Sequence, residues 1–472
     1  MKQVYIETFG CQMNKADTEH MLGLLDEIDY KHTENIEEAN LVLFNTCTIR
    51  ETANHKFYSQ LGIVGKMKKQ RCRDGVTPSL LLGVGGCAAQ DKKEWLIKNF
   101  PYVDIVFGTN NIQNLPELVK KAESGKKVCE IEEELPYELP ELPVIRQTKV
   151  SAWVNVILGC NFNCTYCIVP SVRGREKSRK PEDILKEVER LAEEGFKEVT
   201  LLGQNVTAYG YDLSSNYSKE KATFGHIPDD PEYSLAKLIR YVHDVDGIER
   251  IRFLTGHPFH VTDELIDTVA ELPKACEYFH IPMQSGDNTV LKRMARVYTV
   301  EKYKEMVEKI RNKMPSRGVL QYAHAAITSD FIVGFPGETE EQFLNTVKIV
   351  KEIGFDGCNT AAYSPRPDTP SATWDKQIPE EEKNARLRYL NSVVNEVVGI
   401  KNKDLLDTIQ EVLVEGTSKR NENNLSGRTR GNTIVNFDPT MAGFKPAIVG
   451  TLVNIKITKV KRWALDGEVV GN

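Results

Sequence analysis

Three cysteines stand close together in the chain, at a spacing of C-x3-C-x2-C. They are Cys160, Cys164 and Cys167, in the run Leu158-Gly-Cys-Asn-Phe-Asn-Cys-Thr-Tyr-Cys-Ile. A cubane iron–sulfur cluster that is fully held by protein uses four cysteine thiolates. Three thiolates leave one iron open, and an open metal position is where a small molecule binds and reacts. Tetrahedral sulfur sites also suit zinc, but no nearby Cys or His completes a common zinc pattern; buried thiols are the other alternative.

This triad resembles the motif of the radical S-adenosylmethionine (SAM) superfamily, in which SAM chelates the open iron. The resemblance implies that the three cysteines hold a [4Fe-4S] cluster and that SAM is a cofactor. Tyr166 lies between the last two cysteines, where the superfamily usually has an aromatic residue beside the adenine of SAM.

The composition is that of an ordinary soluble globular protein, with 40% hydrophobic and 27% charged residues. At about 150 residues per domain, the 472 residues predict about three domains. No apolar run approaches the roughly 18 residues of a membrane span, and the N-terminus leads into a strand rather than a signal peptide. We therefore expect a cytoplasmic protein with no membrane partner, in which ten cysteines serve metal binding or catalysis rather than disulfides.

The N-terminal part alternates predicted strands with predicted helices. Four apolar runs read as strands, at residues 4–9, 41–44, 80–84 and 103–107. Alternation of this kind predicts an α/β domain with a doubly wound parallel sheet, over residues 1–129. Residues 130–148 are acidic and rich in proline, which is typical of a linker.

Three further cysteines follow the first three of these strands. Cys11, Cys47 and Cys87 are 36 and 40 residues apart, about one βαβ unit each. Parallel sheets bind ligands beyond the carboxyl ends of their strands. We therefore expect the three thiols to meet at one edge and to hold a second metal cluster. A single cysteine is more often a small buried hydrophobe, so the argument rests on the three equivalent placements.

The surrounding residues resemble the methylthiotransferases, and most closely their MiaB-type branch, which makes 2-methylthio-N6-dimethylallyladenosine in tRNA. The matching runs are Ile6-Glu-Thr-Phe-Gly-Cys-Gln-Met-Asn, Asn45-Thr-Cys-Thr-Ile-Arg and Gly86-Cys-Ala-Ala-Gln. Ala88 departs from the family's usual Met. The resemblance implies that Cys11, Cys47 and Cys87 hold an auxiliary [4Fe-4S] cluster, which supplies or carries the sulfur.

Residues 149–385 contain six predicted strands, most of them followed by a helix. The strands are predicted at residues 153–158, 198–202, 250–254, 278–281, 328–333 and 355–361. Six βα units predict a partial (β/α)6 barrel with its chemistry at the carboxyl ends of the strands. Residues 212–232 read as a polar insertion. The resemblance to radical SAM enzymes implies that Gly203, Gln204 and Asn205 hold the amino group of SAM, with an ordinary turn as the alternative, and that the Gly334 segment cradles its adenine. Gln284 and Ser285 are predicted to reach the SAM ribose or the substrate, with a polar turn as the alternative.

A run of cations follows the triad, and we predict that Arg173 and Arg175 contact RNA. Guanidinium groups recognise carboxylates and phosphates with paired hydrogen bonds, although a surface charge run is usually just solvated. The sequence Arg-Gly-Arg-Glu-Lys-Ser-Arg is again close to the MiaB type. The segment Tyr363-Ser-Pro-Arg-Pro-Asp-Thr also resembles the family, but Asp368 replaces its usual glycine.

After a predicted connecting helix at residues 386–407, the pattern changes to β. Predicted strands at residues 409–414, 433–437 and 448–460 indicate a small β-barrel over residues 408–472. Residues 400–472 carry a net charge of about +3, which leaves about −9 on the rest. A basic module on an acidic enzyme favours RNA binding, with a packing domain as the alternative. The run from Leu425 resembles the TRAM domain, and we predict that Arg428 and Arg430 contact RNA.

The resemblance covers essentially the whole chain and implies a reaction. One SAM methylates a sulfur of the auxiliary cluster, and a second SAM yields a 5′-deoxyadenosyl radical that removes hydrogen from carbon 2 of an isopentenyladenosine next to the anticodon. The implied partners are the tRNA anticodon stem-loop, an electron donor such as flavodoxin or ferredoxin, and a sulfur source. Two relatives in the family modify threonylcarbamoyladenosine in tRNA or an aspartate of a ribosomal protein, and Gln12-Met13-Asn14 argues against both. A non-catalytic RNA-binding iron–sulfur sensor is the alternative from another class.

Overall fold

The computed structural model divides the chain into two compact units. The first comprises Met1–Gln147, Leu158–Asn161 and Ile168–Lys177, and the second comprises Thr148–Ile157, Phe162–Cys167 and Ser178–Asn472. The structure describes residues 2–48, 51–75, 79–134, 141–223, 225–314, 325–419, 421–439 and 448–470. Leu158–Asn161 and Ile168–Lys177, which lie on either side of Phe162–Cys167, therefore group with the N-terminal unit.

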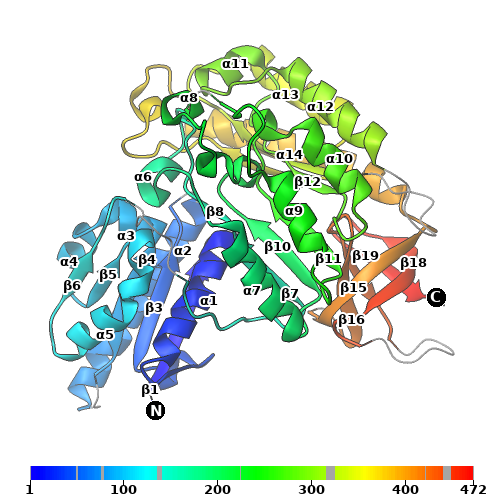
Figure 1. Ribbon diagram of the computed structural model, residues 1–472. Coiled ribbons are helices and arrows are strands. Elements are labelled where there is room, and N and C mark those ends of the chain that lie inside the picture. The colour runs from blue at the N-terminus through cyan, green and yellow to red at the C-terminus, as the bar shows by residue number, and fades with distance from the viewer. Residues whose placement is uncertain are drawn as a thin grey trace. The chain divides into compact units, whose positions relative to one another are not determined.

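The first unit is built on a six-stranded sheet with the order β2-β1-β3-β4-β5-β6, in which every neighbouring pair is parallel (Figure 1). This order extends the flavodoxin-like arrangement of doubly wound folds. The predicted parallel sheet is confirmed, with two short edge strands added. The strands are β1 (Lys2–Phe9), β2 (Tyr30–His32), β3 (Leu41–Thr46), β4 (Leu81–Gly86), β5 (Ile105–Phe107) and β6 (Val128–Glu130).

Helices cover both faces of this sheet, because its central strands are apolar on both faces. Residues of β3 and β4 are buried throughout. The helices α1 (Gln12–Asp26) and α5 (Leu115–Glu123) pack with one apolar cluster, and α2 (Glu51–Arg73) and α4 (Trp95–Asn99) pack with the other. The short α3 (Cys87–Lys92) follows β4, and the 3-10 helix η2 (Thr109–Asn114) follows β5.

The second unit begins with six parallel strands that follow one another in chain order. Three form the sheet β11-β10-β7 and three form the sheet β12-β13-β14, and a parallel bridge between Ile251 and Ala275 lies between the two sets (Figure 1). This is the predicted partial barrel. Its strands are β7 (Ser151–Asn155), β10 (Glu198–Leu202), β11 (Arg250–Leu254), β12 (Tyr278–His280), β13 (Ala326–Val333) and β14 (Gly357–Ala362).

Amphipathic helices bury their apolar faces against these strands in one large core. The helix α7 begins with a proline at Pro181, where the missing N–H costs nothing, and buries Ile184, Val188 and Leu191. The helices are α7 (Pro181–Glu193), α9 (Leu235–His243), α10 (Asp263–Glu271), α11 (Asn288–Arg293), α12 (Val300–Lys313), α13 (Glu340–Ile353) and α14 (Glu380–Lys403). The insertion carries the short α8 (Lys219–Ala222).

The C-terminal strands form a closed five-stranded barrel with the order β15-β16-β17-β19-β18. Its interior is an apolar cluster that includes Val412, Val435, Phe437 and Ile455. The prediction of a small β-barrel is confirmed, with two more strands than the sequence indicated. The strands are β15 (Ile409–Ser418), β16 (Asn421–Thr429), β17 (Ile434–Phe437), β18 (Leu452–Val460) and β19 (Leu465–Val469).

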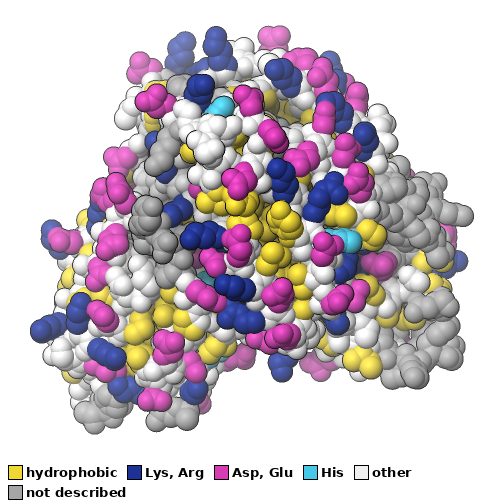
Figure 2. Space-filling view, viewed as in Figure 1, with side chains coloured by type: hydrophobic (Ala, Val, Ile, Leu, Met, Phe, Trp, Pro, Cys, Tyr) yellow, Lys and Arg dark blue, Asp and Glu magenta, His cyan; other side chains and the backbone are white. Residues whose placement is uncertain are grey.

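The described surface carries charges of both signs. Figure 2 shows basic and acidic side chains interspersed over the visible face, with no continuous field of one sign among the described residues there. No helix within the described ranges is both long and apolar enough to cross a membrane.

Candidate functional site

The first unit brings the three N-terminal cysteines to one edge of its sheet. Phe9 at the end of β1 is paired with Thr46 at the end of β3, and Thr46 is paired with Gly86 at the end of β4. Cys47 and Cys87 follow their strands directly, and Cys11 follows β1 after one glycine. Three neighbouring parallel strands thus end in register, and a cysteine follows each of them within two residues.

A polar clip that the sequence did not reveal connects two of these strand ends. Asn14 is fully buried, and its Oδ1 accepts hydrogen bonds from the backbone N–H and the thiol of Cys11, both at 3.3 Å. Its Nδ2 donates to Asn45 Oδ1 at 3.1 Å, and Asn45 Nδ2 donates back to the Asn14 carbonyl at 2.6 Å. Asn14 and Asn45 therefore fix the first cysteine loop to the end of β3.

The three thiols differ in burial: Cys47 and Cys87 are buried and Cys11 is half-buried. Burial raises the pKa of the Cys87 thiol to about 12, with Arg173 opposing the shift, so this thiol would lose its proton on binding iron. Gly86 has a φ of 88°, and a side chain there would meet Asn45 Oδ1 at 2.5 Å, so only glycine fits beside Cys87. All ten cysteines are described, and none forms a disulfide.

No three His, Cys, Asp or Glu side chains among the described residues gather tightly enough to hold a single metal ion. The donor set of three thiols at one sheet edge fits a cubane, whose irons take cysteine thiolates.

The segment around Arg173 also belongs to the first unit, and its guanidinium reaches the same edge. Arg173 Nε donates to Cys87 Sγ at 3.3 Å and Nη2 donates to Asp17 Oδ2 at 2.6 Å. The side chain is buried, whereas the sequence predicted a contact with RNA. Arg175 lies nearby and donates to the Asn161 carbonyl at 3.1 Å. The predicted RNA contact of Arg175 remains a prediction.

Cys160 lies in the first unit, where its N–H donates to the Gly174 carbonyl at 3.1 Å. Cys164 and Cys167 lie in the second unit, in a tight turn closed by a 3.0 Å bond from the Cys167 N–H to the Cys164 carbonyl. Arg296 Nη1 donates to Cys164 Sγ at 3.4 Å, and its other nitrogens bind Tyr298 and a backbone carbonyl. Arg296, unlike Arg173, was not singled out from the sequence.

Tyr166 stands beside the same cysteines. Burial raises its pKa, as do Cys164 and Cys167, while Arg296 opposes the shift. Its ring meets the Phe335 ring edge-on at 6.3 Å. Phe335 follows Gly334, which has a φ of 70° and whose N–H donates to Glu338 Oε2 at 2.6 Å. The structure therefore brings the Tyr166 and Gly334 segments together.

The Gly203-Gln204-Asn205 turn follows β10 as predicted. A Cβ at Gly203 would meet Ile157 Cγ2 at 2.4 Å, so the turn packs closely on the barrel. Asn205 is buried, and its amide lies 3.0 Å from His260 Nδ1 and accepts from Thr207 Oγ1 at 2.9 Å. Gln204 is partly exposed.

Gln284 and Ser285 have different surroundings. Gln284 has a φ of 72° and is partly exposed, and its backbone pairs with β13. Ser285 is fully buried, and its Oγ lies 3.4 Å from Thr346 Oγ1 and accepts from the Asp287 N–H. Ser285 thus ties the turn to α13, and Gln284 remains the partly exposed candidate.

A buried histidine beside the triad was not predicted. The ring of His257 stacks on Phe162 at 3.8 Å between centroids, and its Nδ1 accepts from the Phe259 N–H at 3.3 Å. Burial lowers its pKa well below the usual value, as do Arg296 and His260. Its Nε2 has no hydrogen-bond partner among the described residues. The signal in the sequence was only a His-Pro pair after the third barrel strand.

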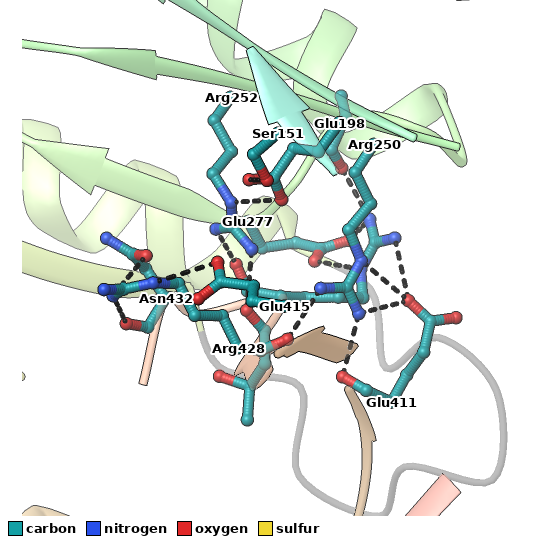
Figure 3. A network of polar contacts seen from close by, with 12 residues as sticks. Ser151, Glu198, Arg250, Arg252, Glu277, Glu411, Glu415, Arg428 and Asn432 are labelled. Atoms are coloured by element: carbon teal, nitrogen blue, oxygen red, sulfur yellow. Dashed lines mark hydrogen bonds and ion pairs between the residues drawn. The ribbon is translucent and has the colours of Figure 1, made fainter. Parts of the chain in front are cut away.

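Two of the predicted RNA-binding arginines, Arg428 and Arg430, contact acidic residues of this chain. Figure 3 shows Arg428 beside Glu415. Arg430 Nε binds Glu277 Oε2 at 2.7 Å, and the arginine side chain is 12% exposed. Arg428 Nε lies 3.2 Å from Glu415 Oε1, and this side chain is 35% exposed. Arg430 therefore links the C-terminal barrel to the end of the partial barrel through an ion pair, whereas the side chain of Arg428 stays partly exposed.

The same network contains two arginines of β11 (Figure 3). Arg250 is fully buried, and its Nη2 donates to Glu411 Oε1 at 2.8 Å and its Nη1 to the Arg428 carbonyl at 2.7 Å. Arg252 Nε donates to Glu198 Oε2 at 2.7 Å. Glu198 is the first residue of β10 and Arg250 the first of β11. The C-terminal barrel therefore packs at the amino ends of these strands, opposite the carboxyl ends.

Comparison with protein families assigns three regions. Residues 154–350 match the radical SAM superfamily, residues 3–108 match the uncharacterized protein family UPF0004, and residues 407–470 match the TRAM domain. Residues 154–350 therefore form a radical SAM domain. Its domains stand in the MiaB-type methylthiotransferase arrangement, with UPF0004 first and TRAM last.

Solved structures of other radical SAM proteins share the fold. The methyltransferase TsrM from Kitasatospora setae, solved with cobalamin and a [4Fe-4S] cluster, has a TM-score of 0.53 at 15% identity, over 79% of this chain and 74% of that one. The cobalamin-dependent enzyme OxsB, solved with SAM, has a TM-score of 0.51 at 12% identity, over 82% of this chain and 56% of its own. At these identities the likeness concerns the fold.

Proposed function

We propose that this enzyme is a tRNA methylthiotransferase that converts N6-dimethylallyladenosine, on the 3′ side of the anticodon, to its 2-methylthio derivative. The observation that carries the proposal is the set of three registered strand ends that deliver Cys11, Cys47 and Cys87 to one edge. Combined with Cys160, Cys164 and Cys167 in a radical SAM core, it provides thiolates for two clusters, which methylthiolation requires.

The residues present fit both groups. Cys160, Cys164 and Cys167 would hold one [4Fe-4S] cluster with SAM, and the three N-terminal cysteines would hold the other. When bound, these groups supply the oxidant that activates an unreactive aromatic carbon and the sulfur that the carbon receives, since a cofactor carries such chemistry. The side chains of the protein would bind and orient the clusters, SAM and the substrate, and would exclude water.

Individual side chains in the second unit suit these binding and orienting roles. Tyr166 and the Phe335 segment offer aromatic and backbone surfaces to the adenine of SAM. Neutral His257, whose Nδ1 accepts a hydrogen bond, carries its proton on Nε2 and offers a buried donor. Extraction of the substrate base from the anticodon stack costs a few kcal/mol, which contacts of the TRAM domain and Arg175 with RNA would offset.

Anaerobic reconstitution followed by reaction with SAM, dithionite and synthetic anticodon stem-loops tests the proposal. We expect about eight irons per chain, about four for each cluster, with formation of 5′-deoxyadenosine and of a 2-methylthio product from the dimethylallyladenosine stem-loop. Stem-loops with threonylcarbamoyladenosine and the ribosomal-protein substrate serve as competitors. Preference for either would replace the proposed substrate, and absence of 5′-deoxyadenosine would favour a non-catalytic iron–sulfur sensor.

A further inference from the structure

Arg173 is a buried cation at the cysteine-bearing edge of the first unit. It ends the short helix α6 (Val169–Arg173), and its side chain is 6% exposed. One arm of its guanidinium binds Asp17 Oδ2 at 2.6 Å, and its Nε–H points at Cys87 Sγ at 3.3 Å. Asp17 and Arg173 are 156 residues apart in the sequence.

The backbone around Arg173 is held firmly in this place. Ile168 and Val172 pack with Cys87 in a small apolar cluster, and Thr109 Oγ1 donates to the Val172 carbonyl at 2.5 Å. The following residue, Gly174, accepts the hydrogen bond from the Cys160 N–H. The α6 segment therefore contacts Cys87 of one triad through a side chain and Cys160 of the other through its backbone.

Charge balance explains why a cation is placed here. Asp17 Oδ2, at 2.6 Å, balances the single positive charge of the buried Arg173 before any cluster is bound. Three ligating thiolates bring more negative charge than one carboxylate, and Arg173 is a cation that contacts one of the sulfurs, Cys87 Sγ. Hydrogen bonds from charged donors are about twice as strong as neutral ones.

We propose that Arg173 is a positioning residue that hydrogen-bonds the Cys87 thiolate of the auxiliary cluster and raises the reduction potential of that cluster. The inference rests on the proposed function, because it takes Cys11, Cys47 and Cys87 as cluster ligands. Hydrogen bonds to the sulfurs and nearby charge are the protein's means of setting such potentials. Asp17 orients the guanidinium and limits the size of this effect.

The two members of the pair then have opposite effects. Arg173→Gln removes a positive charge and the directed N–H, so one electron from dithionite enters the cluster less readily and the potential falls. Asp17→Asn removes a negative charge while Arg173 remains, so the potential rises. A role of the pair in folding alone would not produce shifts of opposite sign.

The test uses the full chain with Cys160, Cys164 and Cys167 replaced by Ala, so that only the auxiliary site is loaded. The parent protein should bind about four irons, and its potential is measured by dithionite titration followed by electron paramagnetic resonance. We expect Arg173→Gln to change the redox equilibrium constant by about tenfold, which is ~59 mV for one electron, toward more negative potential. Arg173→Lys keeps the charge and should recover part of the shift.

Arg146→Gln is the matched control. Arg146 pairs at 2.9 Å with Glu19, which lies on α1 as Asp17 does. Both side chains are at most 8% exposed, and the pair does not include a cysteine. It should lose comparable stability without a change in potential. A change below twofold in Arg173→Gln, or shifts of one sign in Arg173→Gln and Asp17→Asn, would overturn the inference alone. A parent protein that binds no iron would overturn the proposed function together with it.

Discussion

Replacement of Arg252 by Met should loosen the C-terminal barrel from the partial barrel. Arg252 is 3% exposed, and it bonds to Glu198 Oε2 at 2.7 Å, the Arg430 carbonyl at 2.6 Å and the Thr429 carbonyl at 2.7 Å. Met fills a similar volume and supplies none of these donors. The variant therefore leaves a buried carboxylate and two carbonyls without this partner.

The magnitude follows from what Glu198 retains. Removal of one member of a buried ion pair costs about 3–5 kcal/mol. Glu198 keeps a 3.1 Å hydrogen bond from Ser151 Oγ and the field of Arg250, so we take the lower end, about 3 kcal/mol. Since every 1.4 kcal/mol is a factor of ten, protection of β16 amides against hydrogen exchange should fall by about two orders of magnitude.

The control is Arg240→Met. Arg240 and Glu271 form a 2.8 Å pair with side chains 42% and 59% exposed, and such a surface pair is worth less than about 1 kcal/mol. Native-state hydrogen exchange read by mass spectrometry compares the two variants. Equal protection of β16 in both variants would refute the reasoning, because the buried network would then contribute no more than a surface pair.

Three further outcomes follow from the structure. Glu198→Gln should flatten the pH dependence of stability, as measured by urea unfolding at several pH values. Burial raises the pKa of Glu198, but Arg252 and Arg250 lower it more. The stability that Glu198 contributes is therefore present above its unfolded pKa of about 4.3 and is lost as the pH falls below that value. Cys164→Ala should abolish 5′-deoxyadenosine while about four irons remain, and iron analysis that finds none would contradict two independent sites. Gly86→Ala should cost about 1–3 kcal/mol and lower the iron content, because its Cβ would lie 2.5 Å from Asn45 Oδ1; unchanged thermal unfolding would contradict this.

Sequence reasoning succeeded where the pattern was local and repeated. The parallel sheet was predicted from its alternating strands and helices, and Cys11, Cys47 and Cys87 follow neighbouring strands that end in register. That the three thiols hold a cluster stays a prediction. Sequence reasoning missed β2 and β6, which have three residues each, too short to show a period. It also missed β16, whose run Asn-Glu-Asn-Asn-Leu-Ser is polar and takes its strand conformation from its partners in the closed barrel.

The contacts of the charged residues depended on tertiary structure. The cations after the triad predicted a surface for RNA, but the fold packs Arg173 beside Asp17, and no local pattern connects these positions. Arg430 was likewise predicted to contact RNA, and no local pattern indicated its ion pair with Glu277. His257 carried no signal beyond a neighbouring proline, since its importance lies in a ring stack with Phe162.

The central claim is that two cysteine triads in one chain serve methylthiolation of an isopentenylated adenosine in tRNA. Mass spectrometry of the nucleosides of tRNA from a strain that lacks this gene tests it most directly, with complementation by the wild-type chain and by Cys47→Ala. The account predicts that 2-methylthio-N6-dimethylallyladenosine disappears, that N6-dimethylallyladenosine accumulates, and that only the wild-type chain restores the product. Unchanged 2-methylthio-N6-dimethylallyladenosine in the deletion strain would contradict the account.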